Sequence, residues 1–297
     1  MKQLFTVLIA CVLLVSCSSP QQKQELPTYK IGYMICNSEQ ETIDRFVPFT
    51  AYLSKKLGVN FEPIAIDTIN FTREIDNLDF THTNSLLYVI LNRFHGVDIL
   101  AAEKKGSLAE KSQGIIIARK DSSIKKIEDL KGKTMIFGPV LGPTGFMSQI
   151  DLLQSSGIDP DEDLAFYTIP SGSFKHEKVA YGVLFEKYDA GALPLDDIET
   201  MAKAGRIDAE DFTIVAKAPP IPYCNFGVNQ RVDETFAKKF KDAILSITEN
   251  DTVEINGERV KVLDRALVDG YVDITDADFD SVREMAKRTN MPPYQKF

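Results

Sequence analysis

Lys131-Gly-Lys-Thr-Met-Ile-Phe-Gly-Pro-Val-Leu-Gly-Pro-Thr-Gly-Phe-Met-Ser148 is the stretch that decides the fold class of this chain. Met135–Phe137 is a short apolar run, which is typical of a buried strand. Gly138-Pro139 and Gly142-Pro143 then interrupt any regular element. Thr144 stands where the N-cap of a helix is expected, and apolar residues follow it at helical spacing. The stretch therefore predicts a strand, a glycine-rich turn and a helix start.

A helix start of this kind is suited to hold an anion. Its first N–H groups have no acceptor within the helix, and the helix dipole adds positive charge at that end. The candidate ligand contacts here are Gly142, Thr144, Gly145 and Phe146. The turn is not a nucleotide P-loop, because no Lys-Ser/Thr pair follows the glycines. The alternative is an ordinary connection in which Thr144 only caps its helix.

A second turn of small polar residues, Thr83-Asn84-Ser85, repeats this arrangement earlier in the chain. It follows a strand predicted at Leu78–Thr81 and precedes an apolar helix predicted at Leu86–Phe94. Ligands of open α/β sheets bind beyond the carboxyl ends of the strands. We therefore expect both turns to contribute to one binding site.

Strands and helices alternate along the whole body of the chain, which predicts an α/β fold with a mostly parallel sheet in each lobe. Further strands are predicted at 29–34, 60–66, 97–102, 114–118, 164–169, 188–193, 212–216 and 226–229. Further helices are predicted between Ser38 and Gly58, at 71–75, 124–130, 176–186, 196–204 and 233–247, near Val262 and at 276–287.

The N-terminus has the pattern of a bacterial lipoprotein signal. Lys2 precedes the apolar run Leu4–Val15, which at about 1.5 Å per residue is too short for a hydrocarbon core of about 30 Å. Leu14-Val-Ser-Cys17 has the form of a lipoprotein processing site. Residues 1–16 are therefore predicted to be a signal peptide, and Cys17 is predicted to carry lipid outside the cytoplasm. The alternative is a plain secretory signal in which Cys17 has no role.

Residues 17–27 are polar and predict a flexible tether between the lipid and the folded body. The body is long for a single core and suits two lobes. The chain carries 34 Lys and Arg against 43 Asp and Glu, a net charge of −9. This charge excludes nucleic acid and acidic membrane surfaces as partners. A bound anion must be held by local N–H groups and hydroxyls.

Two of the four cysteines remain for the folded body, because Cys11 leaves with the signal and Cys17 takes lipid. Cys36 follows the first strand and Cys224 follows the Pro-rich connector Pro219–Pro222, so both are expected near the cleft floor. The compartment permits disulfides. A Cys36–Cys224 disulfide and two free thiols that bind a soft metal or a thiol-reactive ligand are both left open.

The order of these segments resembles the phosphonate, phosphite and phosphate substrate-binding proteins of ABC transporters. The resemblance covers nearly all of the mature chain. It rests on Phe49–Gly58, Ile127–Lys133, Phe137-Gly138, Thr144–Phe146, Asp189–Ala192 and Ala218–Pro222.

The resemblance implies a two-lobed type II periplasmic-binding fold with two crossovers between the lobes. The first lobe is expected at 28–113 plus 222–297, and the second at 114–221. The implied function is delivery of a small anionic solute to the permease and ATPase subunits of an ABC importer. The implied location is the extracytoplasmic face of the envelope, with the lipid anchor as the only contact with a membrane.

The pocket departs from the family pattern. Where the family usually has a Ser-Thr-Ser triplet, this chain has Gly142, Pro143 and Thr144. Thr83 replaces a common aromatic residue, with Asn84 and Ser85 after it. His176 and Asp196 match positions that the family uses, and Cys224 stands where an acidic residue can meet a ligand amine. We therefore expect weak binding of free phosphate and a preference for a larger anion that also contacts His176 or Asp196.

No catalytic motif is present, since the chain has no His-Glu-x-x-His, Cys-x-x-Cys or Gly-x-Ser-x-Gly. We predict no enzyme activity, no cofactor and no metal. His82, His95 and His176 lack the spacing of a local metal site, although folding could bring two of them together with Cys224. The alternative functions are a binding module that reports its ligand to a membrane sensor, and an enzyme on the same fold.

Overall fold

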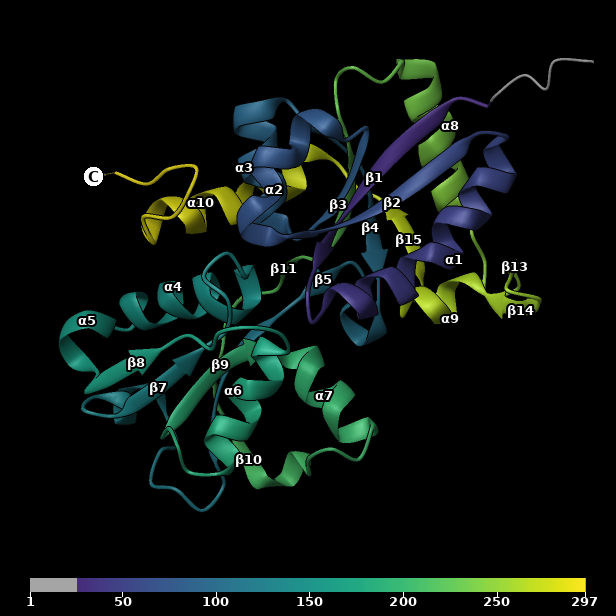
Figure 1. Ribbon diagram of the computed structural model, residues 1–297. Coiled ribbons are helices and arrows are strands. Elements are labelled where there is room, and N and C mark those ends of the chain that lie inside the picture. Colours follow the sequence, from purple (N-terminus) through teal and green to yellow (C-terminus); the bar gives the residue numbers. More distant parts are fainter. Residues whose placement is uncertain (1–25, 297) are drawn as a thin grey trace, which may run out of the picture.

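The chain forms two lobes, one above the other in Figure 1, and each lobe is built on one sheet. The structure is a computed structural model and describes residues 26–296. The predicted signal peptide and Cys17 lie outside these residues. Among residues 26–296, no helix combines the length and the apolar character needed to cross a membrane.

The first lobe contains a six-stranded sheet in the order β15-β4-β12-β3-β1-β2. Its strands are β1 (Thr28–Ile35), β2 (Asn60–Asp67), β3 (Phe80–Thr83), β4 (Asp98–Lys104), β12 (Asn225–Val228) and β15 (Gly270–Asp273). The first four run in one direction, and β12 and β15 run in the opposite direction. The carboxyl ends of β1, β3 and β4 therefore lie at the same edge of the sheet as the start of β12.

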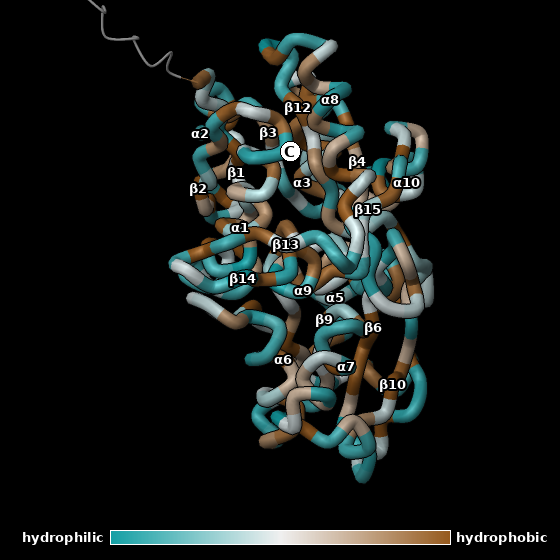
Figure 2. Tube along the Cα trace, turned by 90° about the vertical axis from the view of Figure 1, so that its right-hand side faces the viewer, coloured by the Kyte–Doolittle hydropathy of each residue, from teal (hydrophilic) through white to brown (hydrophobic). Residues whose placement is uncertain are grey.

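Helices cover both faces of this sheet. Those on one face are α1 (Glu39–Leu57), α8 (Glu234–Leu245) and α9 (Val262–Ala266). Those on the other face are α2 (Phe71–Glu74), α3 (Ser85–His95) and α10 (Asp280–Arg288). Figure 2 shows the apolar residues along the strands, where the helices pack.

The second lobe contains a five-stranded sheet in the order β10-β6-β9-β7-β8. Its strands are β6 (Gly114–Arg119), β7 (Thr134–Phe137), β8 (Phe166–Thr168), β9 (Ala190–Pro194) and β10 (Phe212–Lys217). Only β6 runs against the others. The helices α4 (Ser148–Ser155) and α5 (Pro160–Asp163) lie on one face, and α6 (Lys175–Leu184) and α7 (Leu195–Lys203) lie on the other.

Strand β6 shows why the isoleucine run Ile115–Ile117 is continuous rather than alternating. Ile115 and Ile117 pack with α6 and α7, whereas Ile116 packs with α4. Both faces of the strand are buried, so both sets of positions must be apolar. Because such a strand has no polar face, the sequence pattern cannot show which of its sides faces which helices.

The two connections between the lobes lie side by side. β5 (Lys111–Ser112) pairs in antiparallel fashion with β11 (Ile221–Pro222). Apolar contacts also cross between the lobes, since Met147 from the second lobe packs in one cluster with Phe279 and Met285. The lobes are therefore joined by a two-stranded ribbon and by the packing of the C-terminal helix α10.

Local sequence signals explain the first helix well. Ser38 is the N-cap of α1, where its hydroxyl accepts a hydrogen bond from the N–H of Glu41 at 3.2 Å. Gly58 ends the helix with φ of 67°, a left-handed conformation that favours glycine. The predicted span between Ser38 and Gly58 is confirmed.

Other predicted spans need correction. The strand expected at Leu78–Thr81 is β3 at Phe80–Thr83, because Leu78 closes a 3-10 turn through its N–H to Ile75. The helix expected at 124–130 is a 3-10 turn over Ile127–Leu130. The hairpin β13 (Thr252–Ile255) and β14 (Glu258–Lys261), as well as β15, were not predicted. These strands are short and partly charged, so alternation did not reveal them.

Candidate functional site

A cavity of about 170 Å³ lies between the two lobes. Its walls come from the segments that follow β1, β3 and β4 in the first lobe and β7 and β9 in the second. The segment directly before β12 adds Tyr223 and Cys224. The cavity therefore lies beyond the carboxyl ends of these strands, where a ligand of an α/β sheet is expected to bind.

The turn after β7 forms one wall, but its helix begins earlier than predicted. Pro143–Met147 is a π-helical turn that continues directly into α4, and Gly142 precedes it. The expectation that Thr144 is an N-cap is therefore wrong. Proline lacks an N–H and has a fixed φ, so Pro143 is well suited to the first position of the helix. Thr144 and Gly145 instead lie in the first turn, where their N–H groups have no intrahelical acceptor.

The second helix start, at α3, contributes from the first lobe. Asn84 is the N-cap, and its Oδ1 accepts a hydrogen bond from the N–H of Leu87 at 2.8 Å. The same side chain donates through Nδ2 to the carbonyl of Leu141 at 3.1 Å. Asn84 therefore caps its own helix and also joins the two lobes at the cavity. Ser85, the next residue, is buried and lines the cavity.

His176 packs against the β7 turn. Its Nδ1 lies 2.6 Å from Oδ2 of Asp197. Its ring packs directly on Gly138 and Gly145, where a Cβ would lie 2.8 Å and 2.7 Å from the nearest ring atom. Only glycine leaves room for the imidazole at these two positions. The buried Nε2 has no hydrogen-bond partner among the described residues.

Asp196 lies at the outer side of the cavity, in the first turn of α7. It accepts a hydrogen bond from Ser112 Oγ at 3.2 Å and lies 3.7 Å from Nζ of Lys105. Burial raises the pKa of Asp196, and the negative charge of Asp197 raises it further, while Lys105 acts in the opposite direction. The N-cap of α7 is Pro194, so Asp196 and Asp197 lie within the first turn and do not cap the helix.

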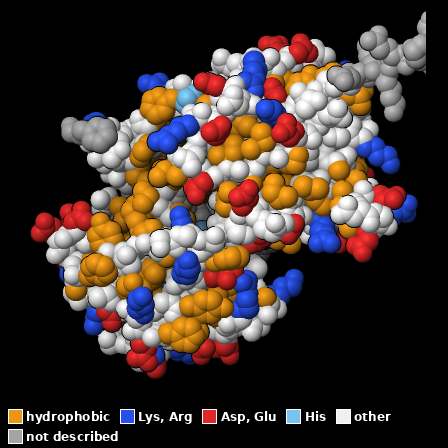
Figure 3. All heavy atoms as spheres, in the orientation of Figure 1, with side chains coloured by type: hydrophobic (Ala, Val, Ile, Leu, Met, Phe, Trp, Pro, Cys, Tyr) orange, Lys and Arg blue, Asp and Glu red, His pale blue; other side chains and the backbone are white. Residues whose placement is uncertain are grey.

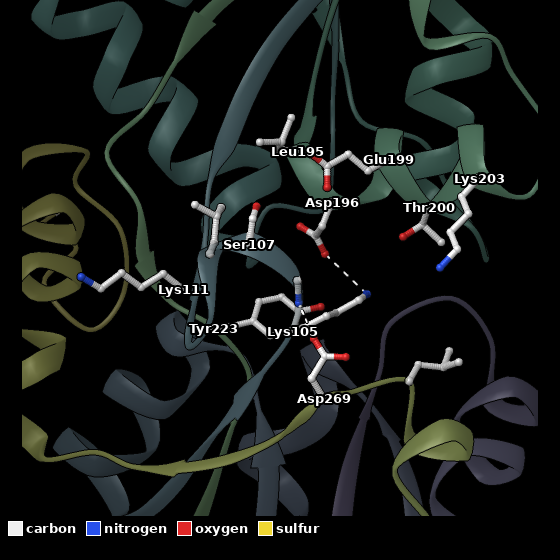
Figure 4. A pocket seen from close by; sticks show the side chains of 13 residues that line it. Lys105, Ser107, Lys111, Leu195, Asp196, Glu199, Thr200, Lys203, Tyr223 and Asp269 are labelled. Atoms are coloured by element: carbon white, nitrogen blue, oxygen red, sulfur yellow. Dashed lines mark hydrogen bonds and ion pairs between the residues drawn. The ribbon is translucent and has the colours of Figure 1, made fainter. Parts of the chain in front are cut away.

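A second pocket of about 390 Å³ adjoins the cavity beyond Asp196. Figure 4 shows side chains of α7 on one side of it and Lys105, Tyr223 and Asp269 on the other. The ion pair between Lys105 and Asp196 crosses from the first lobe to the second within this pocket. Lys105, Asp196 and Tyr223 line both spaces. The outer pocket is therefore continuous with the wall of the cavity.

Arg45 is a cavity residue that sequence reasoning missed. It lies on α1, where its Nε and Nη2 donate to the carbonyl of Ala266 at 3.3 and 2.8 Å. Its Nη2 is 3.9 Å from Glu103. Burial lowers the pKa of Arg45, but Glu103, Cys36 and further acidic groups nearby together raise it by more, so the pKa lies above its ordinary value. A usable signal exists, since Glu41 and Arg45 share one helix face by their i, i+4 spacing directly after β1.

Cys224 lines the cavity, and His82 and Glu103 lie next to it in the interior of the first lobe; all three are buried. His82 Nε2 and Glu103 Oε1 are 2.8 Å apart. Burial alone would raise the pKa of Glu103, but the neighbouring His82 and Arg45 reverse this effect and lower it. Cys36 and Cys224 are both free thiols, and both line the cavity. Of the two states left open by the sequence, the structure contains the free thiols.

Eight of the ten predicted ligand-contact residues line the cavity. They are Asn84, Ser85, Gly142, Thr144, Gly145, His176, Asp196 and Cys224. Thr83 is fully buried and does not line it. Phe146 packs against Phe137 with ring centroids 5.5 Å apart. Lining residues that were not predicted include Asn37, Arg45, Lys105 and Tyr223. Asn37 and Lys105 also follow strands, so the rule that identified Thr83–Ser85 would have found them.

Comparison with known families gives one match over most of the chain. The profile of the family described as "ABC transporter, phosphonate, periplasmic substrate-binding protein" matches residues 31–279. A curated relative, the tetrathionate sensor histidine kinase TtrS of Salmonella typhimurium, is 25% identical over 203 residues. That alignment covers 66% of this chain and 34% of the kinase. The chain therefore spans about a third of that relative.

Solved structures confirm the predicted fold class. PhnD1 from Prochlorococcus marinus, in complex with methylphosphonate, has a TM-score of 0.74 at 19% identity, covering 89% of this chain and 98% of its own. A binding protein component of an ABC phosphonate transporter from Pseudomonas aeruginosa has a TM-score of 0.72 at 19% identity. The match covers 90% of this chain and 87% of that protein. XAC2383 from Xanthomonas citri, bound to ATP, has a TM-score of 0.70 at 16% identity. The match covers 89% of this chain and 97% of that protein. At these identities the likeness shows the fold alone.

Proposed function

Since this chain belongs to the periplasmic substrate-binding proteins of phosphonate ABC transporters, we propose that it binds a small anionic solute between its lobes and delivers it to an ABC importer. Members of this family are binding components and not enzymes. The partners we propose are the permease and ATPase subunits of that importer. The family is periplasmic, which agrees with a location outside the cytoplasm.

One observation carries the choice of an anion. A helix start from each lobe, at Asn84-Ser85 and at Gly142–Gly145, borders the same cavity. Each helix end stabilises an anion by about 0.3–1 kcal/mol when exposed and by up to about 2 kcal/mol when partly buried. Because the chain as a whole is negative, with a net charge of −9, long-range attraction cannot supply this affinity. Figure 3 agrees, since charges of both signs are spread over the visible face.

The proposed ligand is an oxyanion larger than free phosphate. Thr144 is the one hydroxyl at the β7 turn where the family pattern has three, so fewer donors surround a compact anion. Asp196 at the outer side of the cavity repels negative charge from that direction. A solute with one anionic end and a neutral or cationic remainder would bind the helix starts through its anion without being repelled by Asp196. The methylphosphonate complex of PhnD1 gives a related small anion with which to begin a ligand screen.

Calorimetry with a panel of anions tests this proposal. Mass spectrometry of the solute that co-purifies with the protein would select the ligand, and phosphate, phosphonates, carboxylates and sulfonates form the panel. Thr144→Val keeps the shape of the side chain but removes a donor whose charge-assisted hydrogen bond is worth about 1.5–3 kcal/mol. We expect about tenfold to a hundredfold weaker binding.

Thr213→Val is the matched control, because Thr213 lies on β10 and does not line the cavity. It should bind the solute as tightly as the wild type. A neutral solute, or equal affinity of Thr144→Val and the wild type, would show that the anion is not held at this turn.

The anchor is tested separately. We propose that Cys17, which lies outside the described residues, carries the lipid. Cys17→Ser should release the protein into the soluble extracytoplasmic fraction or block its processing. Fractionation and intact mass measure both effects. A processed Cys17→Ser protein that stays with the membrane would exclude this anchor.

A second candidate function is a binding module that reports its ligand to a membrane sensor. The similarity to part of a tetrathionate sensor histidine kinase favours it. Deletion of the gene distinguishes the importer function from the sensor function. Loss of labelled solute uptake supports the importer, whereas normal uptake with loss of a transcriptional response supports the sensor.

A further inference from the structure

Three side chains of the kinds that bind metals lie close together in the first lobe, and one of them, Cys224, lines the cavity. His82 lies on β3, Glu103 on β4, and Cys224 directly before β12, which runs between those two strands. One donor atom from each residue lies within 4.8 Å of the donor atoms of the other two. These are one imidazole nitrogen, one carboxylate oxygen and one sulfur.

The three side chains of this cluster are buried, and only some of their polar atoms have hydrogen-bond partners. His82 and Glu103 are each 1% exposed, and Cys224 is 6% exposed. Beyond the 2.8 Å hydrogen bond between His82 Nε2 and Glu103 Oε1, both residues have a second polar atom that finds no partner within residues 26–296. These atoms are His82 Nδ1 and Glu103 Oε2. Buried polar atoms are nearly always paired, so both residues keep bonding capacity that a further ligand could use.

We propose that His82, Glu103 and Cys224 form a zinc site. Thiolate, imidazole and carboxylate are the ligands that Zn²⁺ uses in proteins, and three protein ligands leave one position for water or another ligand. A hard cation such as Mg²⁺ or Ca²⁺ would not select a thiol. Binding replaces the thiol proton of Cys224 with the metal and releases that proton to solvent.

Arg45 is the charge that opposes a cation here, because its Nη2 is 3.9 Å from Glu103. Its guanidinium is already held by the carbonyl of Ala266. The thiolate and the Glu103 carboxylate together neutralise Zn²⁺, so the added charge is balanced within the cluster. Cys224 also lines the cavity, and the metal would therefore lie beside the solute. The zinc site does not depend on the proposed transport function.

Cobalt is the probe that reports the thiolate directly. Co²⁺ occupies zinc sites of this kind, and a cobalt–thiolate bond gives a near-ultraviolet charge-transfer band, whereas Zn²⁺ is d¹⁰ and silent. The purified, reduced protein is titrated with Co²⁺ as wild type, Cys224→Ser and Cys36→Ser. Cys36 is the matched control, because it lines the same cavity but lies outside the cluster.

We expect the band in the wild type and in Cys36→Ser, and its displacement by added Zn²⁺. Cys224→Ser should lack the band and bind Co²⁺ at least about tenfold more weakly. A wild type without the band, or a band lost in Cys36→Ser alone or in both variants, would overturn the assignment. Melting of the wild type in Zn²⁺ and in chelator needs no variant, since a bound metal must raise the melting temperature. Equal melting temperatures would also overturn it.

Discussion

Asp196 and Asp197 lie next to each other in the first turn of α7, and both line the cavity. Burial raises the pKa of Asp196, and Asp197 adds to this increase. A raised carboxyl pKa means that folding disfavours the ionised form. The cost is absent below the ordinary pKa of 3.8, grows as the pH rises above 3.8, and is fully present above the raised pKa. Asp196 therefore lowers stability at neutral pH, as binding residues often do.

Asp196→Asn should increase the free energy of unfolding at neutral pH, because the amide keeps an acceptor for Ser112 without the repulsion from Asp197. The difference from the wild type should vanish below pH 3.8, the ordinary carboxyl value. Urea unfolding at several pH values measures this. Asp44→Asn, on the exposed side of α1, is the control. A less stable Asp196→Asn protein at neutral pH would show that the ion pair with Lys105 outweighs the repulsion.

At the scale of elements, α3 is held both by its own cap and by the other lobe. The Asn84 side chain accepts from Leu87 within the helix and donates to Leu141 across the cleft. A carboxylate at this position can still accept from Leu87, but it cannot donate to a carbonyl. The two roles of Asn84 can therefore be separated by substitution.

Asn84→Asp should keep the cap and retain nearly wild-type stability, while the unliganded protein becomes more open. Asn84→Ala should lose both contacts and cost about 1 kcal/mol of unfolding free energy. Urea unfolding gives the stability, and the radius of gyration from small-angle scattering gives the openness. If Asn84→Asp scatters like the wild type, the contact with Leu141 does not hold the lobes together.

At the scale of the whole molecule, the C-terminal helix joins the lobes beside the β5–β11 ribbon. Arg288 of α10 binds Asp151 of α4 through two hydrogen bonds of 2.7 and 2.9 Å. This pair connects the last helix of the chain with the second lobe. Rotation of one lobe against the other must therefore strain or break it.

Arg288→Gln should change the unfolding free energy by less than about 1 kcal/mol, because the arginine is largely exposed. It should nevertheless increase the radius of gyration of the unliganded protein. Lys287→Gln is the matched control, since Lys287 forms its ion pair with Glu284 in its own helix rather than with the second lobe. Equal scattering of both variants would show that α10 does not restrain the lobes.

The sequence by itself determined the features that depend on neighbouring residues. Ser38 and Gly58 mark the ends of α1, and the alternation of apolar segments gave the α/β class. The resemblance to a known family was carried by short motifs, and the family profile confirmed it. Capping and periodicity act within about one helical turn, so local sequence is sufficient to predict them. The lobe limits predicted at 113/114 and 221/222 remain a prediction.

Only the tertiary structure decided which distant residues meet. His82 and Glu103 come from two strands and Cys224 from the residue before a third, and the contact of Arg45 with Ala266 joins residues 221 positions apart. Spacing along the chain carries no record of such contacts, because strand order and helix packing create them. The same holds for the start of the helix at Pro143, where contacts between Gly138, Gly145 and His176 fix the turn. Sequence therefore identified where a binding site should lie, and the packing of the two lobes decided which side chains form it.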